Sequence, residues 1–271
     1  MKCLTLLLGL LLILLEAGST LGAGSRAGFS VAVTIPPLAE FVRAVGGQRV
    51  AVTILLPPGA SPHTYEPTPK QLTAARDADV FVAVGSGLET ERLWLKTLEG
   101  SRTLSVNASE GIALIENDPH VWLSIRNTAV MVENICGAFV KLDPGNRTEY
   151  EQNRDSYMKE LRALDEEIGR ELSGVKKILV FHGAWGYFCR DYGMEQLTIE
   201  EGGKEPTPAR IAEVIDTAKR EGIKIVFASP QEDMRYAELI AKEIGGKVVV
   251  IDPLAENYLE NMQGVAEAIG R

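Results

Sequence analysis

The sequence predicts an α/β protein with two similar lobes, each a mostly parallel sheet flanked by helices, joined by one long rigid helix. Short apolar runs rich in Val, Ile and Phe alternate with stretches of helical period in the first half of the chain, and the same alternation returns in the second half. Strands separated by helices favour a parallel sheet covered on its faces. Between the two halves lies a long helical stripe without a strand, which predicts the connection.

The first lobe is predicted over residues 28–143. Apolar, β-branched runs predict its strands, and apolar residues at every third or fourth position predict its helices. Two glycines after the first helical stretch suit a C-cap, and Asp143-Pro144 ends the last one. The predicted elements are strands at 29–35, from 49, at 80–87 and at 102–109, and helices at 38–47, at 69–79 and from near Ile125 to Leu142.

The linking helix is predicted over residues 144–172. Apolar side chains recur there at intervals of three, four and seven, which gives one amphipathic stripe: Tyr150, Tyr157, Leu161, Leu164, Ile168 and Leu172. From Asn146 to Leu172 a helix would be about 40 Å long at 1.5 Å per residue. Such a length suits a bridge between two lobes.

The second lobe is predicted over residues 173–271. It repeats the alternation of the first lobe, although no internal sequence repeat is evident. In such sheets ligands bind beyond the carboxyl ends of the strands. The predicted elements are strands at 176–181, 223–229 and 247–252, and helices at 209–222 and 235–245.

The first 23 residues have the layout of a secretory signal peptide. A basic start precedes an apolar run from Leu4 to Leu15, and Leu21-Gly22-Ala23 offers a small-residue cleavage site. The run is short for a membrane-spanning helix. We therefore expect export to the periplasm or the outer cell surface, with an uncleaved N-terminal membrane anchor as the alternative.

The composition of the 271-residue chain is that of a globular protein with a net charge of −9. This charge argues against a nucleic-acid partner, which would need basic contacts to phosphates, and it is compatible with cations. After signal cleavage Cys136 and Cys189 would remain. Both a disulfide and two buried thiols are compatible with their apolar helical surroundings.

The chain has three histidines, and each lies at the edge of a predicted strand or helix. His63 follows the second strand within SPHTYEPTP, where the prolines predict a stiff, extended loop. His120 precedes the helix that begins near Ile125, and His182 follows the first strand of the second lobe. Residues so far apart can meet only if loops of both lobes face one cleft. No local zinc motif such as HExxH is present.

Five segments, taken in order, resemble the zinc- and manganese-binding receptors of ABC-type metal importers. They are LLPPGASPHTYEPTPKQLTAARDADVFVAVGSGLE, DPHVWLS, the long helix after LDPGN, FHGAWGYFCRDYG and EPTPARIAEVI. The resemblance spans the mature chain and implies two rigid lobes joined by one helix. It also implies that the function is capture of a divalent metal ion, not catalysis. The implied partner is an ABC-type membrane permease with its ATPase, and we expect a monomer.

The resemblance implies that His63, His120 and His182 bind the metal, with Asp252 as the fourth ligand. Three imidazoles and one carboxylate suit Zn(II), whereas Mn(II) favours more oxygen ligands, so zinc is the expected cargo. Glu66 either orients His63 or is solvated. Because only neutral imidazoles coordinate, affinity should fall as the pH drops through about 6.5.

The chain departs from the family pattern at two places. Ile125 stands where the family commonly has a proline, so the helix there can start differently. The segment GIALIEND carries no histidine, whereas many zinc-binding members have a His-rich loop before the second histidine. Any metal-sensing or scavenging role of that loop should therefore be absent.

Three alternatives remain open from the sequence. The first is a manganese or iron receptor of the same type. The second is a secreted zinc hydrolase, which would need an open coordination position and a general base that no motif supplies. The third is a surface adhesin with a structural metal, since some family relatives are described that way.

Overall fold

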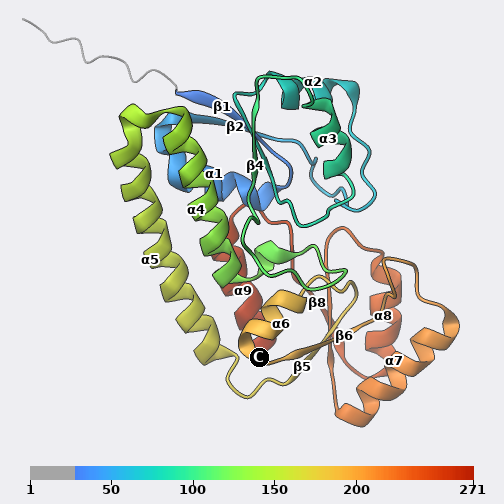
Figure 1. Ribbon diagram of the computed structural model, residues 1–271. Helices are drawn as coiled ribbons and strands as arrows, with labels where there is room; N and C mark the ends of the chain where they lie inside the picture. Colours follow the sequence, from blue (N-terminus) through green and yellow to red (C-terminus); the bar gives the residue numbers. More distant parts are fainter. Residues whose placement is uncertain (1–27) are drawn as a thin grey trace, which may run out of the picture.

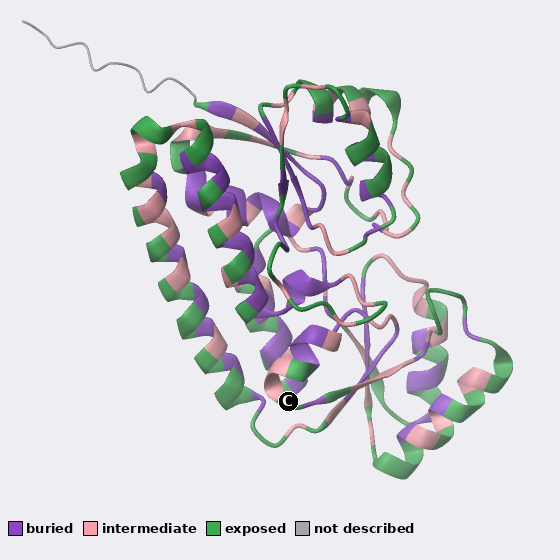
Figure 2. Cartoon of the chain, in the orientation of Figure 1, coloured by how far each residue is buried: buried purple, intermediate pink, exposed green. Residues whose placement is uncertain are grey.

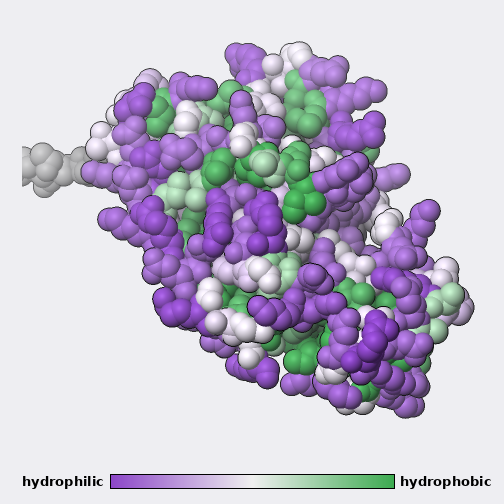
Figure 3. Space-filling view, turned by 60° about the horizontal axis from the view of Figure 1, so that its bottom comes forward, coloured by the Kyte–Doolittle hydropathy of each residue, from purple (hydrophilic) through white to green (hydrophobic). Residues whose placement is uncertain are grey.

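The computed structural model describes residues 28–271, which form two α/β lobes beside a long helix (Figure 1). The predicted signal peptide, residues 1–23, lies outside the described residues. Within the described part, no helix combines the length and apolar character needed to cross a bilayer. On the face seen in Figure 3, hydrophilic residues predominate and hydrophobic residues gather in small groups on both lobes.

The first lobe contains a parallel four-stranded sheet in the order β2-β1-β3-β4. Its central strands are buried on both faces, as expected for a covered parallel sheet. Core residues of α1 and α4 cover one face, and those of α2 and α3 cover the other. The strands are β1 (Phe29–Val33), β2 (Val50–Ile54), β3 (Val80–Ala83) and β4 (Leu104–Asn107), and the helices are α1 (Pro36–Gly46), α2 (Pro69–Asp77), α3 (Glu91–Thr97) and α4 (Ile125–Leu142), with 3₁₀ turns at Gly47–Arg49 and Val121–Leu123.

The second lobe repeats this topology with the order β6-β5-β7-β8, all parallel. Residues alternate in direction along each strand. On β5, Ile178 and Val180 face the core shared with α6 and α9, while Leu179 faces α7 and α8. The strands are β5 (Lys177–Val180), β6 (Glu195–Thr198), β7 (Ile225–Ala228) and β8 (Lys247–Val250), and the helices are α6 (Gly186–Tyr192), α7 (Pro208–Glu221), α8 (Met234–Glu243) and α9 (Tyr258–Gly270).

The connection between the lobes is helix α5 (Arg147–Glu171), which follows a 3₁₀ turn at Pro144–Asn146. It spans 25 residues, or about 38 Å at 1.5 Å per residue. Its predicted stripe, from Tyr150 to Ile168, is buried against the core, and its outer face is exposed (Figure 2). The predicted long helix is therefore present.

The lobes are joined by more than this helix, because one hydrophobic cluster extends from Phe29 to Ile269. Helix α9 follows the last strand of the second lobe and packs back on the first lobe. The Tyr258 ring lies edge-on to Phe41, with 4.8 Å between centroids, and the Tyr258 hydroxyl donates to the Trp122 carbonyl at 2.7 Å. The Glu40 carboxylate of α1 accepts from the Tyr258 amide at 2.6 Å. The interlobe contact is thus a shared core, which opposes wide opening.

The predicted strands and helices are all present, whereas α3, β6, α6 and α9 were not predicted. Helix α4 begins at Ile125 even without a proline there, because Ser124 caps it by accepting from the Asn127 amide at 3.0 Å. Cys136 on α4 and Cys189 on α6 are free, buried thiols. Of the two alternatives, the structure therefore contains two buried thiols and no disulfide between Cys136 and Cys189.

Candidate metal centre

His63 lies in a tight turn after β2. The amides of Thr64 and Tyr65 both donate to the Ser61 carbonyl, at 3.3 and 3.0 Å, and the His63 amide approaches Ser61 Oγ at 3.3 Å. The prediction of an extended loop was therefore wrong in form. The segment is held by a hydrogen-bonded turn that lies between the prolines at 62 and 67. This turn fixes the backbone from which the His63 side chain projects.

His120 and His182 lie at the two other edges that the sequence indicated. The His120 amide donates to Asp118 Oδ1 at 2.9 Å just before the Val121–Leu123 turn, and the side chain of His120 is buried. His182 comes two residues after β5 ends, and its carbonyl accepts from the Ala184 amide at 2.8 Å. Both imidazoles therefore project from backbone segments that local hydrogen bonds hold in place.

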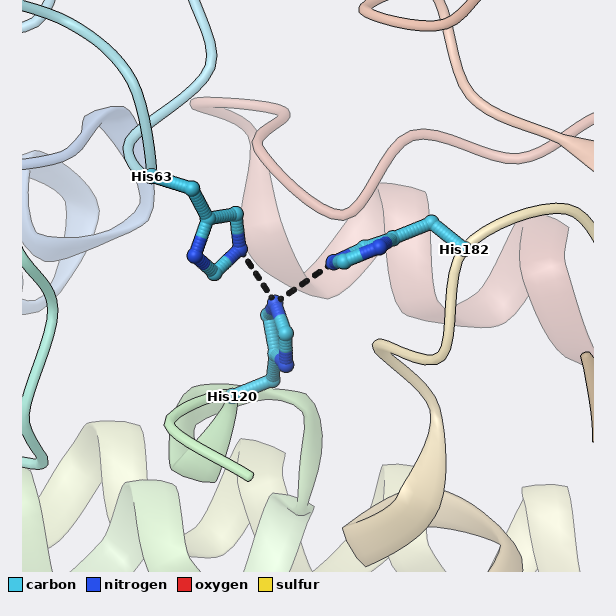
Figure 4. Close-up of side chains that lie close together, drawn as sticks. All are labelled: His63, His120 and His182. Carbon is cyan, nitrogen blue, oxygen red and sulfur yellow. Dashed lines mark hydrogen bonds between the residues drawn. The ribbon is translucent and has the colours of Figure 1, made fainter. Parts of the chain in front are cut away.

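The three imidazoles converge between the lobes, and their Nε2 atoms point toward one another (Figure 4). Nε2 of His120 lies 3.0 Å from Nε2 of His63 and 3.2 Å from Nε2 of His182. For a tetrahedral ion with nitrogen ligands at 2.0–2.1 Å, ligand atoms lie about 3.3 Å apart. The two separations from His120 match such a set, and all three ligand atoms lie within 4.8 Å of one another.

Each imidazole also meets a carboxylate through Nδ1. The Nδ1 atoms lie 3.2 Å from Glu89 Oε2 for His63, 2.8 Å from Asp118 Oδ1 for His120, and 2.6 Å from Glu200 Oε2 for His182. A carboxylate at Nδ1 favours the tautomer with its proton there, which leaves the Nε2 lone pair free. The arrangement therefore presents three nitrogen lone pairs to one point.

The surroundings shift the pKa values of the three histidines in different directions. Burial lowers the pKa of His120 to about 4, and the hydrogen bond that His120 Nδ1 donates to Asp118 opposes this. Burial, and then the neighbouring His182, lower the pKa of His63. Burial also acts to lower the pKa of His182, but the hydrogen bond and charge of Glu200 outweigh it, so this pKa is raised. His182 is thus the imidazole that protonates most readily.

Asp252, which was expected as the fourth ligand, does not join this cluster. Asp252 Oδ1 accepts from the Leu254 amide at 2.9 Å and from Gln231 Nε2 at 3.2 Å, so the carboxylate closes the turn after β8. It lines a separate cavity. Glu66 is exposed, which is the second of its two alternatives, and Glu89 lies beside Nδ1 of His63 instead. Among the described residues, the three histidines supply the converging atoms that could hold a metal ion.

The histidines line a cavity of about 270 Å³ whose charged lining is acidic. Its carboxylates come from the second lobe: Glu200, Glu205, Glu232 and Asp233. No lysine or arginine is found among the described residues of its wall. Burial raises the pKa of Glu232, although hydrogen bonds from Ser229 oppose this. Such a lining attracts divalent cations and repels anions.

The carboxylates at all three histidines were missed from the sequence, and only Asp118 had a local signal. Asp118 lies two residues before His120 in DPH and could have been considered as its partner. Glu200 reaches His182 because β6 lies next to β5, and β6 was not predicted. Glu89 lies 26 residues after His63, and no local pattern connects them.

Comparisons with known proteins agree on one group. The family model described as zinc-uptake complex component A, periplasmic (ZnuA) matches residues 31–271. The high-affinity zinc uptake system protein ZnuA of Bacillus subtilis is 31% identical over 265 residues, which cover 87% of this chain and 82% of that protein.

Solved structures agree as well. A crystal structure of ZnuA superimposes with a TM-score of 0.86 at 36% identity, covering 90% of this chain and 98% of that one. The laminin-binding protein Lmb of Streptococcus agalactiae, described as a bifunctional protein with adhesin and metal-transporting activity, gives a TM-score of 0.83 at 28% identity, with 90% and 98% covered.

Proposed function

This chain belongs to the family of the periplasmic zinc-uptake complex component A (ZnuA), and on that premise we propose that it captures Zn²⁺ between its lobes and delivers it to the permease of an ABC importer. The ion is cargo that must be released intact. The family places the protein outside the cytoplasm, and the finer proposal is export by a signal peptide over residues 1–23, with an uncleaved N-terminal membrane anchor as the alternative.

The observation that carries the proposal is the convergence of three Nε2 atoms, each on an imidazole whose Nδ1 faces a carboxylate. Neutral imidazoles suit zinc, and the carboxylates raise their basicity and fix their orientation. Manganese prefers oxygen ligands, which the three converging atoms do not offer. We therefore propose Zn²⁺ as the cargo, with His63, His120 and His182 as its protein ligands.

Release is proposed to depend on small movements. The shared core and helix α9 oppose wide separation of the lobes, so we propose that the hydrogen-bonded turn of His63 moves as one unit. Permease docking would then need to displace one short turn. A metal-bound and a metal-free structure that differ by wide lobe opening would contradict this.

The proposal is tested by competitive titration of the purified protein with Zn²⁺ and Mn²⁺. We expect one tightly bound Zn²⁺ per chain and much weaker binding of Mn²⁺. The variant His63→Ala/His120→Ala/His182→Ala should lose this binding, and the matched control Asp252→Asn should keep it, because Asp252 faces another cavity. Zinc binding that survives loss of all three histidines would contradict the proposed site.

A zinc hydrolase is separated by a second readout from the same sample. Three protein ligands alone would leave a position for water, as in catalytic zinc sites. The receptor should therefore bind and release zinc without turnover of ester, peptide or phosphoester substrates. Turnover that requires the three histidines would contradict the receptor function and support a zinc hydrolase.

A further inference from the structure

The carboxylate that orients His120 is pressed against a helix of the other lobe. The Asp118 side chain is only 10% exposed, and its Oδ1 serves both the amide and Nδ1 of His120. Its other oxygen, Oδ2, lies over Gly186, the first residue of α6: a Cβ built on Gly186 would be 2.3 Å from this oxygen. Real Cβ contacts essentially never come this close, so any side chain at 186 would displace the carboxylate.

Gly186 is thus required for space and not for backbone conformation. It lies in regular helix and is absent from the glycines with positive φ within the described chain. Alanine is normally the better helix residue. The absence of a Cβ at this position therefore serves the close approach of Asp118.

The next residue of the same helix holds the backbone of the His120 segment. The fully buried Tyr187 hydroxyl donates to the Asp118 carbonyl at 3.1 Å and accepts from the Ile115 amide at 2.7 Å. Helix α6 therefore touches both the side chain and the main chain of Asp118.

The segment that enters α6 also carries His182. The His182 carbonyl accepts from the Ala184 amide, and Gln196 of β6 accepts from the Trp185 amide at 3.0 Å and donates to the Gly183 carbonyl at 3.4 Å. Only four positions separate His182 from Gly186. One short, well-bonded unit of the second lobe thus carries its own ligand and supports that of the first lobe.

We propose that Gly186 and Tyr187 are positioning residues for metal binding: the seating of α6 on Asp118 sets His120 relative to His182. The inference rests on the proposed zinc site and adds residues that touch no metal ligand directly. It makes zinc affinity depend on a packing contact between the lobes. A shift of this contact would separate the two imidazoles without any change in the ligands themselves.

The test is zinc affinity of Gly186→Ala in the full protein, measured by competition with a chelating dye. We expect binding about 10- to 100-fold weaker, the range found when partners of metal ligands are lost. The control is Gly264→Ala on α9, where an added Cβ meets nothing within 4 Å and affinity should be unchanged. The visible spectrum of bound Co²⁺, which reports ligand geometry, should change in Gly186→Ala and not in the control.

A double-mutant cycle shows whether the effect passes through Asp118. Asp118→Ala removes the oxygen that a Cβ at 186 would strike. In that background Gly186→Ala should cost less than about twofold in affinity, since the loss has already occurred. An equal cost in both backgrounds would overturn the proposal.

Two further outcomes are decisive. If Gly186→Ala does not fold, Tyr187→Phe takes its place: it keeps the ring and removes the two hydrogen bonds, and affinity of the folded variant should still fall. If Gly186→Ala folds and binds zinc with wild-type affinity, the positioning role is overturned. If Gly186→Ala does not fold, wild-type affinity in Tyr187→Phe overturns it. Failure of the wild type to bind zinc would instead overturn the proposed function.

Discussion

The two lobes share one strand order and yet hold their histidines differently. The first lobe supplies His63 and His120, whose pKa values are lowered because burial dominates. The second lobe supplies His182, whose pKa is raised because Glu200 at 2.6 Å outweighs burial. One topology therefore supports two kinds of imidazole, one that stays neutral in acid and one that takes up a proton early. The carboxylates and burial around each loop make this difference, not the sheets.

The largest effect is expected when His120, the buried imidazole of the first lobe and a proposed ligand, is removed. His120→Ala should weaken zinc binding on the order of 10³-fold, because a third of a binding free energy of ~12 kcal/mol is about 4 kcal/mol. His182→Ala should cost less where His182 is partly protonated in the wild type, because zinc must then also displace that proton. Titration of both variants at pH 6.5 with a competing chelator measures the order. A greater loss in His182→Ala would invert the comparison.

Acidification should separate the lobes' contributions without mutation. Since the pKa of His182 is raised above 6.5, proton competition begins above that value, and each further pH unit costs about tenfold for one competing proton. His63 adds a second proton only below 6.5, and His120 only near pH 4. Zinc affinity measured from pH 8 to 5 should thus fall with a slope that steepens. Affinity that is constant over this range would contradict zinc binding through neutral imidazoles.

His120 also predicts the sign of a stability change in the metal-free protein. Its pKa is about 4 when folded, so the unfolded chain binds more protons between pH 6.5 and 4. The contribution of His120 to the free energy of unfolding is therefore lost as the pH falls through this window. Urea unfolding of wild type and His120→Gln at pH 7 and 5 measures this loss, which the variant should lack.

The partners of Nδ1 should have smaller effects than the ligands, again unequal between the lobes. Glu200→Gln should weaken zinc binding about 10- to 100-fold at pH 8. It should also lower the pH at which the variant's affinity begins to fall from its own plateau, since the charge that raises the pKa of His182 is gone. Glu89→Gln should cost only a few-fold, because Glu89 is 60% exposed and 3.2 Å away. Equal losses in the two variants would show that burial of the carboxylate does not matter.

Much of this arrangement was predictable from the sequence because local patterns encode it. Alternating apolar runs and helical periods placed both sheets and α5, and the position of each histidine at an element edge indicated a shared cleft. The missed strand β6 has a weaker signal: only Leu197 is apolar in Glu195–Thr198, and the strand lies at a sheet edge. Without β6, Glu200 could not be assigned to His182.

The predicted fourth ligand, Asp252, illustrates the other limit. Asp252 follows a strand, which suits a ligand and a turn equally, and the structure places it in a turn. Whether an Asp-Pro carboxylate points into the cleft depends on how α9 returns to the first lobe. That return rests on contacts between residues more than a hundred positions apart, such as Trp122 Nε1 donating to the Pro253 carbonyl at 2.7 Å. Periodicity does not record such contacts.

The smallest effect on zinc affinity is expected at the tie between the lobes. Glu40 accepts from the amides of Tyr258 and Leu259 at the start of α9 and from the Tyr157 hydroxyl at 2.5 Å. Glu40→Ala leaves these donors unpaired and should lower the free energy of unfolding by about 2–3 kcal/mol. Zinc affinity of the folded variant should change less than about threefold, because the α6–Asp118 contact still sets the imidazoles. Urea unfolding and zinc titration of the same sample compare the two. A large loss of affinity would mean that the lobes hold their histidines through α9 and not through α6.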